Sequence, residues 1–358
     1  MSVSQEIDWA TLTGRPQPVL DERAVADVLH GRPVVVTGAA GSLGWPLSMA
    51  IARAKPSRLV LLDWHESSLF RLRQALMHLA PDVPVQAVLG DVRDATRLLR
   101  VFTEMHPAVV FHLAAYKHVP WGEEDPSAFA SVNVLGAHAV IGAATKAGVA
   151  RIVYPSTDKA IDPPSLYGAT KRLVEAQLRV AAGSGGPACT IVRFVNVLGS
   201  QGSAPETFAR LIRRHEALSV TDPAMRRYWI TPAHATLLLL HGGCLSEDAV
   251  IVAPDAGDEI EVIEIVRRLG AQIAPGEPSP EIRVTGARPG ERLSEPLVAP
   301  HEVLERVPLP GLLAVRGLRS LDAREVAATV GNVARLLSED ATDNDVRNAL
   351  FTDTWTLQ

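Results

Sequence analysis

Cysteine, aromatic side chains and excess positive charge are all scarce in this chain of 358 residues. Its two cysteines, Cys189 and Cys244, lack a metal-binding spacing and are too few for a disulfide framework, so we expect a reducing, cytoplasmic setting. The formal net charge of -5 provides no basic field, so we expect no nucleic-acid partner. The apolar run at 236–240 is far shorter than the ~20 residues that cross a bilayer. Because residues 1–15 also lack the features of a secretory signal, we expect no membrane partner.

Hydrophobic residues make up 47% of the chain and charged residues 21%, which indicates a folded globular protein. Between the apolar runs lie longer segments with helical spacing, such as 43–54 and 67–79. The runs are nearly continuous rather than alternating, as in a parallel sheet covered by helices on both faces. We therefore predict a doubly wound α/β Rossmann fold. Its strands are expected at 34–36, 59–62, 85–89, 109–113, 152–154 and 190–194.

Beyond residue 194 this alternation breaks, and loops rich in Gly, Pro and Ser appear. We predict an N-terminal arm at 1–32 and a dinucleotide-binding domain at 33–198, to which later segments return. Residues 199–358 are expected to form mainly a smaller C-terminal α/β lobe that binds the substrate. Helices are predicted in that part near 207–216, 232–245, 259–269 and 322–337.

A glycine-rich segment follows the first predicted strand and opens the first helix. In that position the first glycine permits a tight turn, the second lets the backbone approach a diphosphate, and the third lets helix and strand pack closely. The helix N-terminus adds free N–H groups for an anion. A purely structural glycine turn is the alternative. The phosphate-binding residues predicted here are Gly38, Gly41, Ser42, Leu43 and Gly44.

Two acidic residues follow the next strands. Asp63 ends the second strand, where a carboxylate accepts hydrogen bonds from ribose hydroxyls and disfavours a 2′-phosphate, so NAD is favoured. Arg71 and Arg73 nearby keep NADP open. Asp91, followed by Val92 after the third strand, is placed to touch the adenine, or else to cap the helix that follows.

Tyr167 and Lys171 are spaced one helical turn apart, on one face of a predicted helix. A tyrosine is a poor base at neutral pH unless positive charge stabilises its phenolate, and Lys171 can supply that charge. The same spacing arises often by chance, but here it follows a glycine loop and five crossover units.

The segment that ends the fifth strand carries Thr157, Asp158 and Lys159, at the edge where doubly wound sheets bind ligands. Thr157 can hydrogen-bond a sugar hydroxyl. Hydride transfer alone does not need the adjacent acid and base Asp158 and Lys159, whereas proton transfers at two further carbons of the substrate do. A solvated surface ion pair is the alternative interpretation.

Taken together, eight segments resemble successive motifs of one family. That family is the polysaccharide-biosynthesis group of extended short-chain dehydrogenases/reductases, typified by inverting UDP-N-acetylglucosamine 4,6-dehydratases, and the likeness spans roughly residues 15–298. The segments are Thr37–Gly44, His112–Pro120, Asn133–Gly136, Ser156–Ala160, Tyr167–Arg172, Arg193–Ser200, Val220–Pro223 and Arg288–Glu291.

The resemblance implies a tightly bound NAD or NADP that is regenerated within the cycle. Tyr167 would take the proton of the 4-hydroxyl as C4 is oxidised, Lys159 would remove the C5 proton, and Asp158 would protonate the departing 6-hydroxyl. Lys159 qualifies as a base if burial or nearby cations, such as Lys171, favour its neutral form.

The resemblance also assigns binding residues and an assembly state. A homo-oligomer is expected, because helices of this fold often pair subunits. Further cofactor-binding positions are Ala114, Ala115, Lys117 and Asn133, and positions for the nucleotide sugar are Lys117, His118, Asn196, Arg227, Arg288 and Glu291.

Other functions remain open at this stage. A 5,6-dehydratase that stops at an unsaturated sugar needs the same residues, whereas a 4-epimerase needs neither Asp158 nor Lys159. A non-catalytic dinucleotide-binding regulator would have little reason to keep these residues together.

The segment Ser203–Glu206 departs from the apolar loop of the family and places a carboxylate near the expected sugar pocket.

Overall fold

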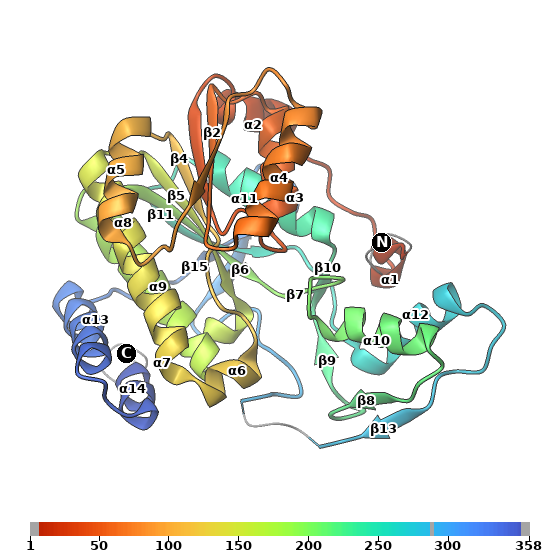
Figure 1. The fold of residues 1–358 in the computed structure, drawn as a ribbon. Coiled ribbons are helices and arrows are strands. Elements are labelled where there is room, and N and C mark those ends of the chain that lie inside the picture. Colours follow the sequence, from red (N-terminus) through yellow and green to blue (C-terminus); the bar gives the residue numbers. More distant parts are fainter. Residues whose placement is uncertain (1–6, 287–289, 352–358) are drawn as a thin grey trace.

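The computed structural model describes residues 7–286 and 290–351, and one large sheet runs through them (Figure 1). Neighbouring strands pair in parallel from β11 to β3, while β15 and β14 are antiparallel additions at the other end. The predicted strands are confirmed. In spatial order the strands of this sheet are β14 (Val303–Arg306), β15 (Leu312–Arg316), β11 (Ala249–Pro254), β6 (Ala188–Phe194), β5 (Arg151–Thr157), β4 (Val109–His112), β1 (Pro33–Thr37), β2 (Arg58–Asp63) and β3 (Val85–Leu89).

Helices cover both faces of the sheet, as the continuous apolar runs predict. One face carries α2 (Glu22–Leu29), α3 (Gly44–Arg53), α4 (Glu66–Leu79) and α11 (Pro232–Cys244). The other carries α5 (Ala95–Met105), α8 (Gly136–Ala147) and α9 (Leu166–Gly183), as Figure 1 shows. In β1, Val34 and Val36 pack into the first layer and Val35 into the second, so the strand is buried on both sides.

A smaller lobe stands beside the sheet, with a hydrophobic core of its own (Figure 1). The N-terminal arm contributes to it, because Trp9 is buried there and the Arg268 guanidinium donates a hydrogen bond to the Leu12 carbonyl. The lobe and the segments that join it to the sheet comprise α1 (Trp9–Thr13), α10 (Ala204–Arg213), α12 (Val262–Ile273) and the strand pairs β7 (Asn196–Val197) with β10 (Trp229–Ile230), β8 (Leu218–Val220) with β13 (Ile282–Val284), and β9 (Arg226–Arg227) with β12 (Ile260–Glu261).

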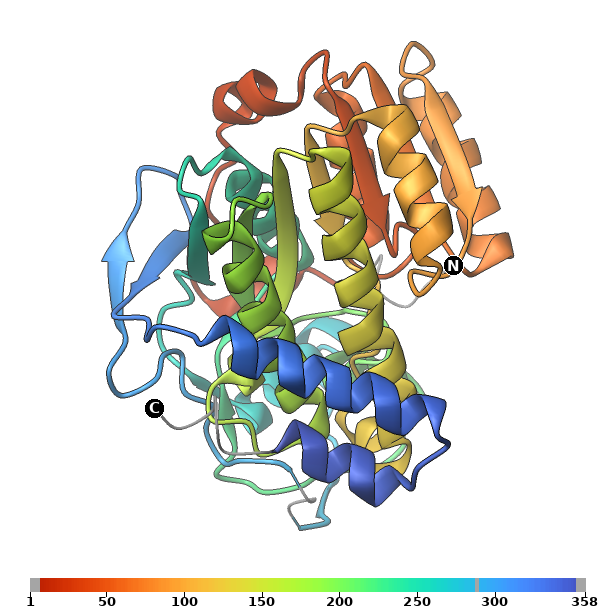
Figure 2. The same cartoon turned by 90° about the vertical axis from the view of Figure 1, so that its left-hand side faces the viewer.

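The other predicted C-terminal helices form, but they pack on the main domain. Helix α11 lies against β5 and β6. Helices α13 (Ala323–Ser338) and α14 (Asp343–Leu350) pack on α9 and on the segment 126–135, and Figure 2 shows them in blue lying across that face. Helical spacing in the sequence shows that a segment has an apolar face, but not which layer covers it.

Within the described part of the chain, one helical stretch, Pro126–Ala147, is long and apolar enough to cross a membrane by length and composition. It comprises α7 (Pro126–Phe129), a π-helical turn at Ala130–Leu135 and α8. Of its most apolar window, 56% is buried inside the protein. Its second half packs against α5 and β4, which is the position of a core helix.

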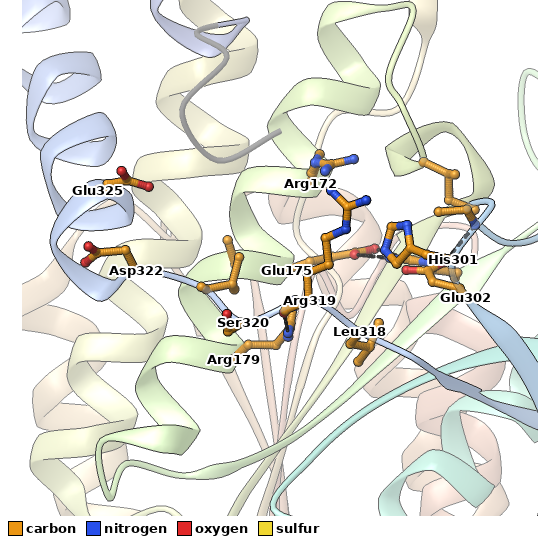
Figure 3. Close-up of a pocket in the computed structure, with 15 residues that line it drawn as sticks. Arg172, Glu175, Arg179, His301, Glu302, Leu318, Arg319, Ser320, Asp322 and Glu325 are labelled. Carbon is orange, nitrogen blue, oxygen red and sulfur yellow. Dashed lines mark hydrogen bonds and ion pairs between the residues drawn. The ribbon is translucent and has the colours of Figure 1, made fainter. Parts of the chain in front are cut away.

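A buried ion network fastens α9 to the sheet. Arg193 on β6 donates to both carboxylate oxygens of Glu175 on α9 and, at 2.7 Å, to Glu302. Glu175 also accepts a hydrogen bond of 2.5 Å from Ser156 on β5. Beside this network lies a cavity of about 270 Å³, and Figure 3 shows Arg172, Arg319 and Glu175 around it. The network therefore joins β5, β6 and α9 at one point.

Breaking this network should cost much more stability than breaking an exposed ion pair. Arg193→Ala leaves two buried carboxylates without their cation and should lower the free energy of unfolding by about 3–5 kcal/mol. Arg335→Ala removes the exposed pair with Glu339 on α13 and should cost less than about 1 kcal/mol. Urea unfolding followed by circular dichroism measures both. Equal losses would contradict the role given to the buried network.

Candidate active site

The glycine loop between β1 and α3 has a geometry that only glycine permits. Gly38 has φ of +67°, and a Cβ atom there would lie 2.6 Å from the backbone nitrogen of Ala114 on the next loop. A Cβ on Gly44 would lie 2.1 Å from the carbonyl oxygen of Gly38. Helix α3 begins at Gly44 without a side-chain cap. The Trp45 N–H donates to the Gly41 carbonyl and Pro46 has no N–H, so an anion at this helix start would meet the N–H groups of the loop up to Gly44.

A continuous cleft opens at this loop and runs along the carboxyl ends of the parallel strands. One part has a volume of about 770 Å³ and the other about 370 Å³. Gly38, Trp64, Tyr116 and Gln201 line both parts, which makes them two halves of one cleft. Its position matches the edge at which doubly wound sheets bind ligands.

The smaller half of the cleft contains the two predicted acidic residues. Asp63 is buried, and its carboxylate accepts hydrogen bonds of 2.9 Å from the N–H groups of Ala40 and His65, so it also fixes the glycine loop. Asp91 does not cap the next helix, because Asp94 does that. Instead its carboxylate binds the Arg93 guanidinium, and these hydrogen bonds hold the pKa of Asp91 below its usual value.

The larger half contains Tyr167 and Lys171, which α9 presents to the cleft one turn apart. Burial raises the pKa of the Tyr167 phenol, although a hydrogen bond with Thr157 opposes this. Burial lowers the pKa of Lys171 to about 7, while Glu175 acts in the opposite direction. The Lys171 ammonium group donates to the Pro155 carbonyl at 2.9 Å. The phenol is therefore protonated at neutral pH. It must lose this proton before the phenolate can accept another, and positive charge nearby favours that loss.

The end of β5 brings Thr157, Asp158 and Lys159 to the same place. The hydroxyl of Thr157 donates to Asp158 Oδ1 at 2.9 Å, and Lys159 Nζ donates to the same oxygen at 3.0 Å. Thr157 and Lys159 line the cleft with Tyr167, whereas Asp158 lies behind them and is only 1% exposed. Its second oxygen, Oδ2, is buried without a hydrogen-bond partner in the described structure. The alternative of a solvated surface pair is therefore wrong.

The surroundings of Lys159 differ from the sequence-based expectation of cationic neighbours. Its ion-pair partners are the carboxylates of Asp158 and of Glu295, whose Oε1 lies 3.9 Å from Nζ. Carboxylates at such distances favour the ammonium form of a lysine. Glu295 comes from the chain after β13, far away in sequence, which is why local motifs did not indicate it.

Lys117 links the glycine loop to the loop that contains Gln201. Its ammonium group donates to the Gln201 carbonyl at 2.9 Å and lies 3.4 Å from the Ser42 hydroxyl of the glycine loop. His118 and Asn196 line the same part of the cleft. Glu206, expected near the sugar pocket, accepts a hydrogen bond of 2.6 Å from the Gly202 N–H and thereby shapes the loop that contains Gln201.

Several predicted residues lie elsewhere. Asn133 sits in the π-helical turn and holds the loop at Tyr116 by hydrogen bonds to both its N–H and its C=O. Arg227 donates to the carbonyls of Arg226, Arg292 and Leu293, so its guanidinium fastens a loop. Glu291 is described but does not appear among the residues that line the cleft. Arg288 lies outside the described residues.

The remaining predicted positions do line the cleft. The cleft or near-cleft residues that the sequence did not single out include Trp64, Gln201 and Glu295. A tryptophan directly after Asp63, at the end of a strand, was a sequence signal that could have been used, and in the structure this residue is 69% exposed. The residues that were predicted and that line the cleft are Gly38, Gly41, Ser42, Leu43, Gly44, Asp63, Asp91, Val92, Ala114, Ala115, Lys117, His118, Thr157, Lys159, Tyr167, Lys171 and Asn196.

This arrangement suits a dinucleotide and a second ligand held side by side. The glycine loop has the close backbone packing of a diphosphate-binding loop, because a Cβ atom at Gly38 or Gly44 would collide with neighbouring backbone atoms. Beyond it, a phenol, a hydroxyl and an amine face one volume, and a buried carboxyl stands behind the amine. Such a set can move protons at more than one position of a bound molecule.

Comparison with known proteins agrees with this geometry. A family model described as polysaccharide biosynthesis protein matches residues 34–316. A capsular polysaccharide biosynthesis protein of Staphylococcus aureus is 32% identical over 84% of this chain, which spans only 50% of that relative's length. A UDP-N-acetylglucosamine 4,6-dehydratase (inverting) of Campylobacter jejuni is 29% identical over 76% of the chain and 79% of its own. The fold is similar to that of a dTDP-glucose 4,6-dehydratase from Streptomyces venezuelae solved with NAD (TM-score 0.64, 21% identity, 75% of this chain and 88% of that one).

Replacing the third glycine should disable the dinucleotide site. Gly44→Ala forces a Cβ atom against the Gly38 carbonyl, so we expect the variant to lose the increase in melting temperature that NAD⁺ gives the native protein. Gly142→Ala on α8 meets open space and should keep that increase. Thermal unfolding with and without NAD⁺ measures both. A normal NAD⁺ response from Gly44→Ala would show that the loop does not hold the diphosphate.

Proposed function

The chain belongs to the polysaccharide biosynthesis protein family, and we propose that it is a nucleotide-sugar 4,6-dehydratase acting on UDP-N-acetylglucosamine. The broader part of the proposal is a nucleotide-sugar-modifying short-chain dehydrogenase/reductase, which the family match and the similarity to a UDP-N-acetylglucosamine 4,6-dehydratase support. One observation carries the finer proposal: Tyr167, Thr157 and Lys159 face one cleft beside the glycine loop, with Asp158 hydrogen-bonded to Lys159.

Oxidation at C4 of the sugar is the first step. A bound nicotinamide dinucleotide, held by the glycine loop and Asp63, supplies the hydride acceptor at C4 and later the hydride donor at C6. Tyr167, as the phenolate, takes the proton of the 4-hydroxyl. Because burial holds the pKa of Tyr167 high, the phenolate requires positive charge beside the ring. Thr157, within hydrogen-bonding reach of Tyr167, positions that hydroxyl.

Elimination of water follows, because the 4-ketone acidifies the hydrogen on C5. Lys159, as the neutral amine, accepts that proton while the C6–O bond breaks. Asp158, as the neutral acid, supplies the proton with which the 6-hydroxyl departs as water. Afterwards the pair is ammonium and carboxylate, and the contact of 3.0 Å lets a proton return from Lys159 to Asp158. Of the two protons taken from O4 and C5, one leaves with water and one returns to C5.

The burial of Asp158 bears on how that proton is delivered. Asp158 does not reach the cleft surface, so the path to O6 runs through Lys159 or Thr157, both of which contact its Oδ1. A 4-epimerase has no proton to move at C5 or C6 and would not need this buried acid–base pair. The pair therefore favours dehydration over epimerisation.

We also infer the cofactor preference and setting. Asp63 lies in the smaller half of the cleft, where its negative charge would repel a 2′-phosphate, so NAD is proposed over NADP. A cytoplasmic homo-oligomer remains the proposed state.

Incubation of the purified protein with UDP-N-acetylglucosamine tests this function directly. Mass spectrometry should show loss of one water, and a hydrazide reagent should trap a 4-ketone. An unsaturated product without the ketone would indicate a 5,6-dehydratase. An isomer of unchanged mass would indicate an epimerase, and unchanged substrate across several UDP-sugars would favour a regulator.

Removing the amine of Lys159 should stop the reaction after its first half. Lys159→Ala should lower the rate of water loss by at least about 10²-fold, because general-base catalysis typically contributes that much. NAD⁺ binding should persist, since Lys159 does not contact the glycine loop in the described structure. Lys146→Ala at the last turn of α8 is the matched control and should leave the rate unchanged. Undiminished dehydration by Lys159→Ala would overturn the assignment of the base.

A further inference from the structure

Among the described residues, the Glu295 carboxyl forms an ion pair with Lys159 and has no role in the proposed reaction. It lies in the chain after Gly290, yet its side chain is only 2% exposed and reaches the end of β5. Its Oε1 lies 3.9 Å from Lys159 Nζ and 3.7 Å from the Arg227 guanidinium. Both distances are longer than a hydrogen bond, so neither cation fully compensates the buried carboxyl.

Two carboxyl oxygens near Lys159 lack partners. Glu295 Oε2 and Asp158 Oδ2 are both buried without a hydrogen bond in the described structure. A buried carboxylate oxygen without a donor is unfavourable, whereas a protonated carboxyl carries less charge to solvate. The geometry therefore favours a proton on one member of the group.

The charged groups around Glu295 come from three segments. Asp158 and Lys159 follow β5, Arg227 belongs to β9, and Arg292 lies on the same loop as Glu295. Arg227 is engaged by three carbonyl groups, and Arg292 is paired with Asp162 at 2.9 Å. Burial raises the pKa of the Glu295 carboxyl; Lys159 lowers it, Asp158 raises it, and Arg227 and Arg292 lower it.

Lys159 can accept a proton from carbon only as the neutral amine. With Asp158 and Glu295 both ionised, two negative charges stabilise its ammonium form. With Glu295 uncharged, only Asp158 remains, and one proton can pass between Asp158 and Lys159 across their contact of 3.0 Å. The charge of the Glu295 carboxyl therefore decides whether Lys159 can be the neutral amine that acts as a base.

We propose that Glu295 is a positioning residue for proton transfer by Lys159: uncharged, it lets Lys159 and Asp158 share one proton, and ionised, it fixes Lys159 as the ammonium. This rests on the proposed dehydration. Activity should then fall as pH rises and Glu295 loses its proton, although a lone lysine base would become more active. The sign of this pH dependence sets the proposal apart from a merely structural role.

The pH profile of Glu295→Gln tests the proposal. Glutamine keeps the shape and cannot ionise, so the alkaline fall in kcat should move upward by at least about one pH unit, while KM for the sugar nucleotide changes by less than about threefold. The rates measured are water loss and uptake of deuterium from solvent at C5. Glu281→Gln removes an exposed carboxyl beside β13 and is the matched control. A profile for Glu295→Gln that superimposes on the native one, or loss of C5 exchange at every pH, would overturn the proposal.

A second measurement does not depend on the reaction. In the NAD-bound protein labelled with carboxyl-¹³C glutamate, the resonance that disappears in Glu295→Gln should titrate with a pKa above the ordinary range of glutamate. Titration within the ordinary range would refute the inference even if dehydration is confirmed. If the native protein does not dehydrate UDP-N-acetylglucosamine, the proposed function fails, while this titration still decides the state of Glu295.

Discussion

Parallel pairing of the strands from β3 to β6 is the constraint on which the site depends. Because these strands run in one direction, their carboxyl ends meet along one edge of the sheet. The glycine loop follows β1, Asp63 ends β2, and Thr157 ends β5. Residues more than a hundred positions apart thus share a cleft without any long excursion of the chain. Helix α9, which follows the β5 end directly, adds Tyr167 and Lys171 to the same volume.

The cleft is completed by segments that return from the smaller lobe. Arg227 on β9 holds the carbonyls of Arg292 and Leu293, and this places Glu295 beside Lys159. Arg292 in turn binds Asp162, just beyond the end of β5. The proton-handling group therefore includes parts of both lobes.

The sequence predicted features set by local spacing and missed features set by distant packing. The strands, the glycine loop and the Tyr167–Lys171 pair follow from short-range patterns, and the structure contains all of them. Helix α11 was expected in the smaller lobe, but its nearly all-apolar sequence suits burial against β5 and β6 equally well. Glu295 was missed because a lone glutamate before a proline has no local signal. Arg227 was expected to bind phosphate, yet its partners are carbonyls that sequence spacing cannot reveal.

The ion network of Arg193 fixes the end of β5 and helix α9, and this explains how the unpartnered oxygen of Asp158 is tolerated in the site. Arg193 on β6 binds Glu175 and Glu302. Glu175 lies on α9 two turns beyond Tyr167, and it is hydrogen-bonded to Ser156 on β5, one residue before Thr157. Since the strand end and the helix are fixed from below, Asp158 cannot rotate freely toward solvent to satisfy its second oxygen. A ligand or a proton that supplies the missing hydrogen bond removes this unfavourable free energy, and its binding is strengthened accordingly. The protein alone provides no hydrogen-bond donor for Asp158 Oδ2 in the described structure, so a bound group that provides one is stabilised by this site.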